Sequence, residues 1–157
     1  MPFPNQDQEE KLWCWAAVAV DVDHYMTPQT ASTQCLVACA VLKSTQCCAN
    51  GDRCNQPAPL AAALRKLQIR SRVLNHPLSV KQLHKRLSRN LPVCARIRWA
   101  GGSRHFVVIT GLHPTPKGSY VVDIIDPFYP EATMLYETFR TAYLGRGVWE
   151  GTILVLG

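Results

Sequence analysis

The first half of the chain contains apolar segments of helix length; alanine and valine dominate the first of them, residues 13–26, and Pro28 closes it. Proline, serine or threonine bounds most of these segments, as is typical of helix ends. Leu60, Leu64 and Leu67, for example, fall on one stripe. The pattern predicts helices over residues 13–26, 31–42 and 57–67, and a further helix that begins after an N-cap at Ser79.

After residue 92 the pattern changes to alternation, which is typical of strands. Val93 and Ile97 point to one face of the segment 92–99, while Arg96 and Arg98 point to the other. Further elements are expected as strands over 69–74, 106–111, 119–125 and 151–156, a turn at 114–118 and a short helix at 136–144. Helices followed by antiparallel strands predict an α+β fold. The length of 157 residues predicts a single domain, residues 1–157.

The composition places the chain among globular proteins, because 47% of its residues are hydrophobic. No apolar run approaches the ~18 residues of a membrane span, so none is expected. The first residues are polar, and no signal peptide is expected in this chain. A protein that leaves its cell would then have lost a leader or used another route, and we expect a monomer.

The formal charge is +6, and basic residues are concentrated between Arg65 and Arg104. Such a segment is either a nucleic-acid surface or the solvated face of a basic protein. Aromatic side chains are not interleaved with these charges as base stacking would require. The solvated face is therefore favoured, and no nucleic-acid partner is expected.

Seven cysteines are many for a reduced protein, and five of them fall in one segment. The cluster consists of Cys35, Cys39, Cys47, Cys48 and Cys54. Disulfides made in an oxidising compartment and a zinc site are the two explanations. The segment has no paired C-x2-C spacing and no histidine, so disulfides are favoured, with their pairing left open, and no metal or cofactor is expected. Cys94 is expected to be a buried free thiol in a strand.

Cys14 lies between Trp13 and Trp15, where an apolar helix begins. The unpaired N–H groups and the dipole of a helix N-terminus stabilise a thiolate, which attacks a carbonyl far better than a thiol does. The alternative is a structural cysteine packed between two core tryptophans. Cys14 is thus a candidate nucleophile that needs a base.

Among five histidines, His105 is the candidate base, because it follows Gly101 and Gly102 and opens a predicted strand. The alternative is a hairpin histidine with no partner. Asp126 ends the next strand, and it can orient the imidazole from the side away from the nucleophile. Asp123 is its competitor but points to the opposite face, and either carboxylate can instead cap a turn.

Together these residues resemble a known family. Gln8 six residues before Cys14, Trp15 directly after it, and the order Gln, Cys, His, Asp match the signature of papain-like cysteine proteases. The compact pattern of Trp-Cys-Trp-Ala-Ala, Gly-Gly-x-x-His-Phe-Val-Val-Ile-x-Gly and Asp-Pro is most similar to the avirulence cysteine proteases of plant pathogens and, more distantly, to bacteriocin-leader peptidases. The resemblance spans residues 8–127. Two departures from papain are a shorter interval between cysteine and histidine and Asp126 in place of asparagine.

The resemblance implies a papain-like fold, in which the helical part carries the nucleophile and the antiparallel sheet carries histidine and aspartate. It implies that Gln8 and the backbone N–H of Cys14 bind the oxyanion and that Cys14 forms a thioester. His105 would protonate the leaving amine. Trp15, Gly101 and Gly102 would border the substrate cleft.

The function expected from this resemblance is that of a cysteine endopeptidase acting on a protein substrate. A secreted effector or a toxin domain delivered into a target cell is expected, with an inhibitor or immunity protein as a possible partner. A deamidase or transglutaminase-like toxin can use the same Cys-His-Asp triad and is the main alternative. A binding module that has kept only the fold is disfavoured by the intact set Gln8, Cys14, His105 and Asp126.

Overall fold

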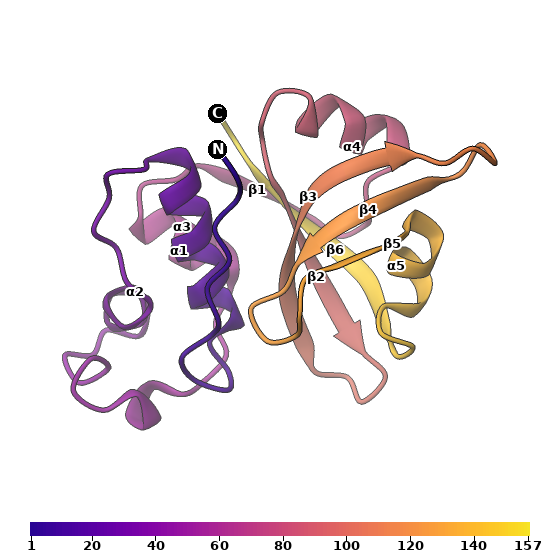
Figure 1. Cartoon of the computed structure of the whole chain (residues 1–157). Coiled ribbons are helices and arrows are strands. Elements are labelled where there is room, and N and C mark those ends of the chain that lie inside the picture. Colours follow the sequence, from indigo (N-terminus) through magenta and orange to yellow (C-terminus); the bar gives the residue numbers. More distant parts are fainter.

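The computed structural model describes all 157 residues, and it confirms the α+β class: helices dominate the first part of the chain and an antiparallel sheet the second (Figure 1). The helices are α1 (Cys14–Met26), α2 (Gln34–Leu42), η1 (Gly51–Cys54, a 3-10 turn), α3 (Leu60–Lys66), α4 (Val80–Leu87) and α5 (Tyr136–Ala142). The strands are β1 (Ser71–Leu74), β2 (Val93–Trp99), β3 (Arg104–Pro114), β4 (Tyr120–Ile125), β5 (Ala132–Leu135) and β6 (Gly147–Val155).

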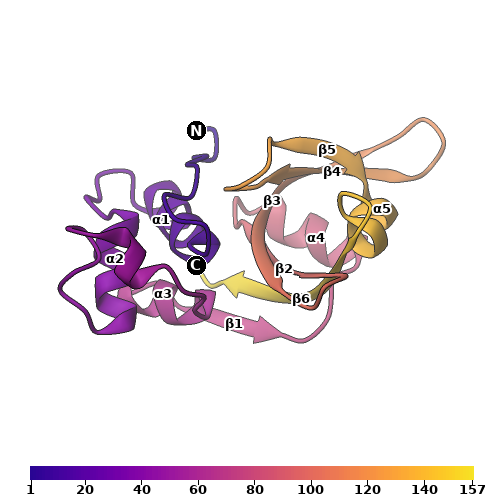
Figure 2. The same ribbon diagram turned by 90° about the horizontal axis from the view of Figure 1, so that it is seen from below.

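The six strands form one sheet in the order β1-β6-β2-β3-β4-β5, with every pair antiparallel. Helices α1, α2 and α3 gather beside the sheet as a separate layer, and Figure 2 shows the strands curving away from them. Both faces of the central strands are buried. Cys94, Phe106 and Val108 pack with the α1–α3 layer, whereas Ile97 and Val107 pack with α4 and α5 on the other side.

Helix ends follow the sequence signals. Thr33 caps α2 by accepting from the N–H of Leu36, so this helix begins three residues later than predicted. At α4, Ser79 and Gln82 form a reciprocal capping box, with bonds of 3.2 and 2.8 Å. Strand β5 was not predicted from the sequence, because this short edge strand is only half-buried and carries no apolar run.

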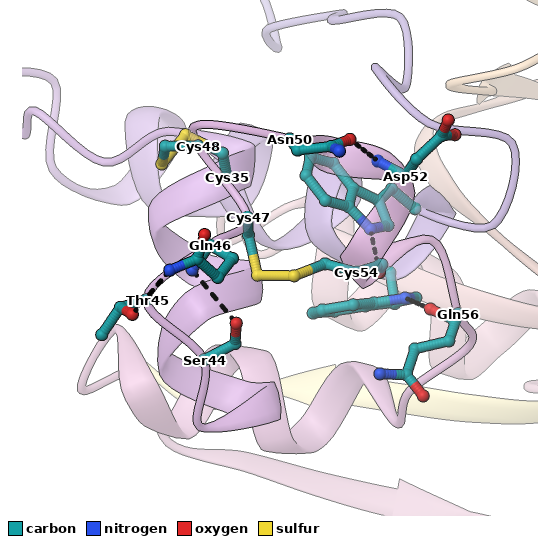
Figure 3. The surroundings of a disulfide bond; sticks show 12 residues. Cys35, Ser44, Thr45, Gln46, Cys47, Cys48, Asn50, Asp52, Cys54 and Gln56 are labelled. Carbon is teal, nitrogen blue, oxygen red and sulfur yellow. Dashed lines mark hydrogen bonds between the residues drawn. A yellow bond between two sulfur atoms is a disulfide. The ribbon is translucent and has the colours of Figure 1, made fainter.

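Two disulfides hold the irregular segment between α2 and α3, as predicted for the cysteine cluster. Cys35 of α2 is bonded to Cys48, and Cys47 is bonded to Cys54 at the end of η1 (Figure 3). Cys39 is free, as are Cys14 and Cys94. The segment has few apolar side chains, so these cross-links replace burial as the source of its order.

None of the helices is both long enough and apolar enough to cross a bilayer. No group of three or more histidine, cysteine, aspartate or glutamate side chains lies close enough together to hold a metal ion.

Candidate active site

Cys14 is the first residue of α1, and it is 8% exposed. The tryptophans on either side are buried and anchored to the disulfide-bonded segment. The indole of Trp13 donates to the carbonyl of Cys54 at 2.7 Å, and that of Trp15 donates to the carbonyl of Gln56 at 3.0 Å. The backbone N–H of Cys14 has no protein acceptor, as is usual in the first turn of a helix. The thiol therefore lies at the positive end of α1 beside a free donor.

His105 approaches from β3, where it is paired with Ile97 of β2. It is 6% exposed, and its Nε2 lies 2.8 Å from Oδ1 of Asp126, the residue that directly follows β4. Nδ1 is then the ring nitrogen left for Cys14, whose thiol interacts with the His105 side chain. Thiol, imidazole and carboxylate thus form one chain of contacts supplied by α1, β3 and the end of β4.

Asp126 is a buried hub, 1% exposed, that accepts hydrogen bonds through both carboxylate oxygens. Besides His105, Oδ1 accepts from the backbone N–H groups of Phe128 at 2.8 Å and Tyr129 at 3.0 Å. Oδ2 accepts from the hydroxyl of Tyr143 at 2.7 Å. Burial raises the pKa of Asp126, but the hydrogen bonds and the charge of His105 outweigh it, so the pKa lies below its ordinary value. The carboxylate stays ionised and fixed.

The pKa of His105 responds to the same contacts in the opposite direction. Burial lowers it, but the hydrogen bond and charge of Asp126, together with the Cys14 thiol, raise it to about 9. The imidazole is therefore readily protonated at neutral pH. A protonated imidazole between a thiol and a carboxylate can hold a thiolate as its counter-ion and can deliver a proton to a leaving group.

Aromatic rings enclose the imidazole. Trp99 stacks on His105 with ring centroids 5.7 Å apart, and on Tyr143 at 5.9 Å. Tyr129 meets His105 edge-on at 6.4 Å. The guanidinium of Arg146 lies 5.0 Å over the Trp99 ring and donates to the Tyr129 hydroxyl at 2.5 Å. This enclosure fixes the ring plane of His105 and shields its bond to the carboxylate from water. Sequence reasoning gave no role to Trp99 or Tyr143.

Asp123, the competing carboxylate, lies elsewhere. Its Oδ2 is 2.6 Å from Nε2 of His113, and its Oδ1 accepts from the Thr133 hydroxyl at 2.7 Å. His113 is paired on the exposed part of β3, away from His105. The structure thus brings Asp126, and not Asp123, to the imidazole.

Gln8 is positioned by a backbone hydrogen bond to the carbonyl of Pro127 at 2.8 Å, which brings it beside the segment that follows Asp126. Its Nε2 donates to the carbonyls of Glu10 at 3.0 Å and Lys11 at 2.5 Å. Its Oε1 is buried and has no hydrogen-bond partner. Both amide hydrogens are thus engaged inside the loop, which differs from the expected orientation toward an oxyanion.

A cleft of about 630 Å³ opens beside Cys14 between the helical layer and the sheet. Trp15 and Gly102 are among the residues that line it. Gly101, in the same exposed turn of the β2–β3 hairpin, does not line it. The other lining residues are Leu12, Cys14, Pro57, Ala58, Pro59, Leu60, Ala61, Val73, Arg96, Ser103, Arg104, Phe106 and Ile153.

A helical layer with a cysteine at a helix start, facing a sheet that carries a paired histidine and aspartate, defines the class of papain-like cysteine proteases. Comparison with protein families identifies the particular one: the family model described as papain-like cysteine protease AvrRpt2 matches residues 1–140. The chain belongs to this family, and it is a papain-like cysteine protease. The resemblance expected from the signature residues is thereby confirmed.

Among solved structures, the chain is similar to that of the Pseudomonas avirulence protein AvrPphB. The identity is 9% and the TM-score 0.41, over 99% of this chain and 97% of that chain. No curated protein matches the sequence.

Proposed function

We propose that the protein is an endopeptidase that cleaves a protein substrate through a thioester on Cys14, with His105 as acid and base and Asp126 as its orienting carboxylate. The observation that carries this proposal is the buried chain of contacts from the Cys14 thiol through His105 to Asp126. The helical layer and the sheet share one core beside the cleft, which supports a single catalytic domain over residues 1–157.

The first half of the reaction forms the acyl-enzyme. The thiol proton of Cys14 passes to Nδ1 of His105, and the sulfur attacks the scissile carbonyl carbon. The tetrahedral intermediate collapses as the carbon–nitrogen bond breaks, and His105 delivers its proton to the departing amine. Asp126 holds the imidazole in place and stabilises its protonated form, which the raised pKa of His105 reflects.

The second half releases the acyl group. A water molecule takes the position of the departed amine, and His105 accepts its proton as the oxygen attacks the thioester carbon. The carbon–sulfur bond then breaks, and the sulfur regains its partnership with the protonated imidazole. The product leaves as a free carboxylate, and Cys14 is ready for another cycle.

Negative charge develops on the carbonyl oxygen in both steps, and it needs donors. The unpaired N–H of Cys14 is one. Gln8 is proposed as the second, and for this role one hydrogen of its Nε2 has to leave the carbonyl of Glu10 or Lys11 when substrate binds. The amide is neutral, so it donates at any pH.

We further propose that the protein acts outside its cell of origin, as an effector delivered into a target cell, with a host or bacterial protein as substrate. Two disulfides support an oxidising stage in its life, and the resemblance of the signature residues to avirulence cysteine proteases agrees with such delivery. A toxin acting on competitors, neutralised by an immunity protein, is the related possibility that target identification will decide.

The test uses Cys14→Ala and the matched variant Cys39→Ala, which removes another free thiol that does not line the cleft. Wild type and Cys39→Ala should split candidate protein substrates into fragments, and Cys14→Ala should not. The folding free energy of Cys14→Ala should change by no more than about 1–2 kcal/mol, because only a small buried group is lost. Intact products carrying hydroxyl in place of an amide NH2 would show deamidation instead, and full activity of Cys14→Ala would rule out the mechanism.

A further inference from the structure

The cleft beside Cys14 combines an apolar interior with a purely cationic wall. Leu60, Phe106 and Ile153 are among the apolar residues that line it. The only charged side chains that line it are Arg96 and Arg104, and no carboxylate does. An apolar site with convergent guanidinium groups is suited to a ligand that carries both an apolar group and an anion.

The two arginines are held in place by a carboxylate behind the cleft. Oε1 of Glu150 lies 3.0 Å from Nε of Arg96 and 2.6 Å from Nε of Arg104, and Oε2 lies 3.3 Å from Nε of Arg98. The arginine charges lower the pKa of Glu150, although burial raises it, so this carboxylate stays ionised. Three arginines on one carboxylate leave an excess of two positive charges.

Glu150 contacts Arg96 and Arg104 through Nε alone. The terminal N–H groups of both guanidinium groups make no hydrogen bond to the protein. A guanidinium group has five donors arranged as a fork that matches a carboxylate. Glu150 therefore orients the arginines and leaves their terminal forks free beside the cleft.

The strand register places the arginines of this cluster where their positive charges repel each other and lower the stability of the fold. Arg98 and Arg104 lie directly opposite each other on β2 and β3, where like charges are destabilising. Arg96 is paired with Gly151 of β6, and a Cβ at that glycine would lie 2.7 Å from Nη2 of Arg96. Gly151 leaves room for the guanidinium group of Arg96. The repulsion between Arg98 and Arg104 remains, and it lies next to the cleft that the substrate would enter.

We propose that Arg96 and Arg104 select substrates that carry an aspartate or glutamate close to the scissile bond, beside an apolar side chain that enters the cleft. The inference rests on the proposed peptidase function and deepens it by naming the substrate class. An acidic side chain gains charge-assisted hydrogen bonds from the free forks. A lysine or arginine at the same position meets two guanidinium groups whose positive charge Glu150 only partly offsets, and it is rejected.

The test measures binding and cleavage separately, with synthetic peptides that differ only in aspartate, asparagine or lysine at each position around one apolar residue. Binding is measured by fluorescence anisotropy with Cys14→Ala, and cleavage by wild type is measured as kcat/KM. We expect the best aspartate peptide to exceed its asparagine counterpart by about tenfold, in line with the ~1.4 kcal/mol of one charge-assisted bond. The preference should weaken between about 0.05 and 0.5 M salt.

Variants assign the effect to the cleft wall. In Arg96→Gln/Arg104→Gln the preference for aspartate should fall to about twofold or less. The control is Arg98→Gln, which removes one arginine from the same carboxylate, Glu150, but at a position that does not line the cleft. This variant should retain most of the preference. Arg104→Glu should reverse the preference toward lysine.

The outcomes separate the two proposals. Cleavage with equal rates for aspartate, asparagine and lysine peptides would overturn the acidic selection and leave the peptidase function standing. Selective binding of aspartate peptides by Cys14→Ala, with no cleavage by wild type, would overturn the peptidase function and support the selection. An aspartate preference that survives in Arg96→Gln/Arg104→Gln would show that other residues cause it, and would also overturn the proposal.

Discussion

The substitution Asp126→Asn removes the negative charge beside His105 and so measures the effect of that charge. The carboxylate favours the imidazolium form so strongly that the pKa of His105 reaches about 9 in spite of burial. Compared with the ordinary value of 6.5, this corresponds to about 3 kcal/mol, at about 1.36 kcal/mol for each factor of ten. The Cys14 thiol contributes to the same effect, so the share of Asp126 lies below that total.

The sign of the effect on stability follows from linkage. Because the pKa of His105 is higher in the folded protein than in the unfolded chain, this stabilisation is fully present below pH 6.5 and is lost as the pH rises through about 9. Without the carboxylate charge the pKa of His105 falls, and we expect this loss of stability to become smaller in Asp126→Asn. Urea unfolding at about pH 6 and about pH 9.5 measures it. Asp123→Asn, which removes a carboxylate bonded to the exposed His113, should keep the wild-type dependence.

Activity gives the second readout. Asparagine can keep its oxygen toward His105 and the N–H groups of Phe128 and Tyr129, while the Tyr143 hydroxyl rotates to accept from its amide. We therefore expect Asp126→Asn to lower kcat by about 10- to 100-fold and His105→Ala by about 10³-fold or more. Equal losses in the two variants, an unchanged pH dependence in Asp126→Asn, or a larger loss in Asp123→Asn would each refute the reasoning.

Two further predictions concern the cysteines and Gln8. Thiol titration of the unfolded, unreduced protein should find three free thiols, Cys14, Cys39 and Cys94, whereas seven would contradict the disulfides. Replacing both Cys47 and Cys54 by alanine should lower the free energy of unfolding by about 2–3 kcal/mol. Gln8→Ala should lower kcat by about 10²- to 10³-fold at nearly unchanged KM if the amide serves the oxyanion. A lowered melting temperature with normal kcat would instead limit Gln8 to bracing its loop.

Much of the fold follows from local signals. The alanine- and valine-rich segment closed by Pro28 placed α1, and the alternation of residues 92–99 placed β2 together with its arginine face. The grouping of Cys14, His105 and Asp126 was also expected, because a signature of residue types and order marks it. Their catalytic roles stay predictions until variants are measured.

Contacts that depend on how the elements pack against each other leave no comparable pattern in the sequence. Tyr143 was placed in a helix, but its bond to Asp126 depends on how α5 packs against the sheet. The arginine cluster on Glu150 depends on the register of β2, β3 and β6. Trp99 lies beside His105 because the register of β2 and β3 places Ile97 opposite His105. Each of these contacts joins different elements, and no residue pattern within one element encodes it.

The two disulfides differ in how easily a reducing agent can reach them. Cys48 is exposed and Cys35 half-buried, whereas Cys47 and Cys54 are 2% and 1% exposed. Thiol–disulfide exchange requires an attacking thiolate to reach a sulfur, so a reducing medium opens the Cys35–Cys48 bond first and releases α2 from the loop. The buried Cys47–Cys54 bond outlasts it and keeps the Cys54 carbonyl beneath the Trp13 indole. An enzyme built in this way can move from an oxidising to a reducing compartment, where Cys14 stays reduced. It keeps the hydrogen bond from Trp13 to Cys54 that holds the start of α1 in place.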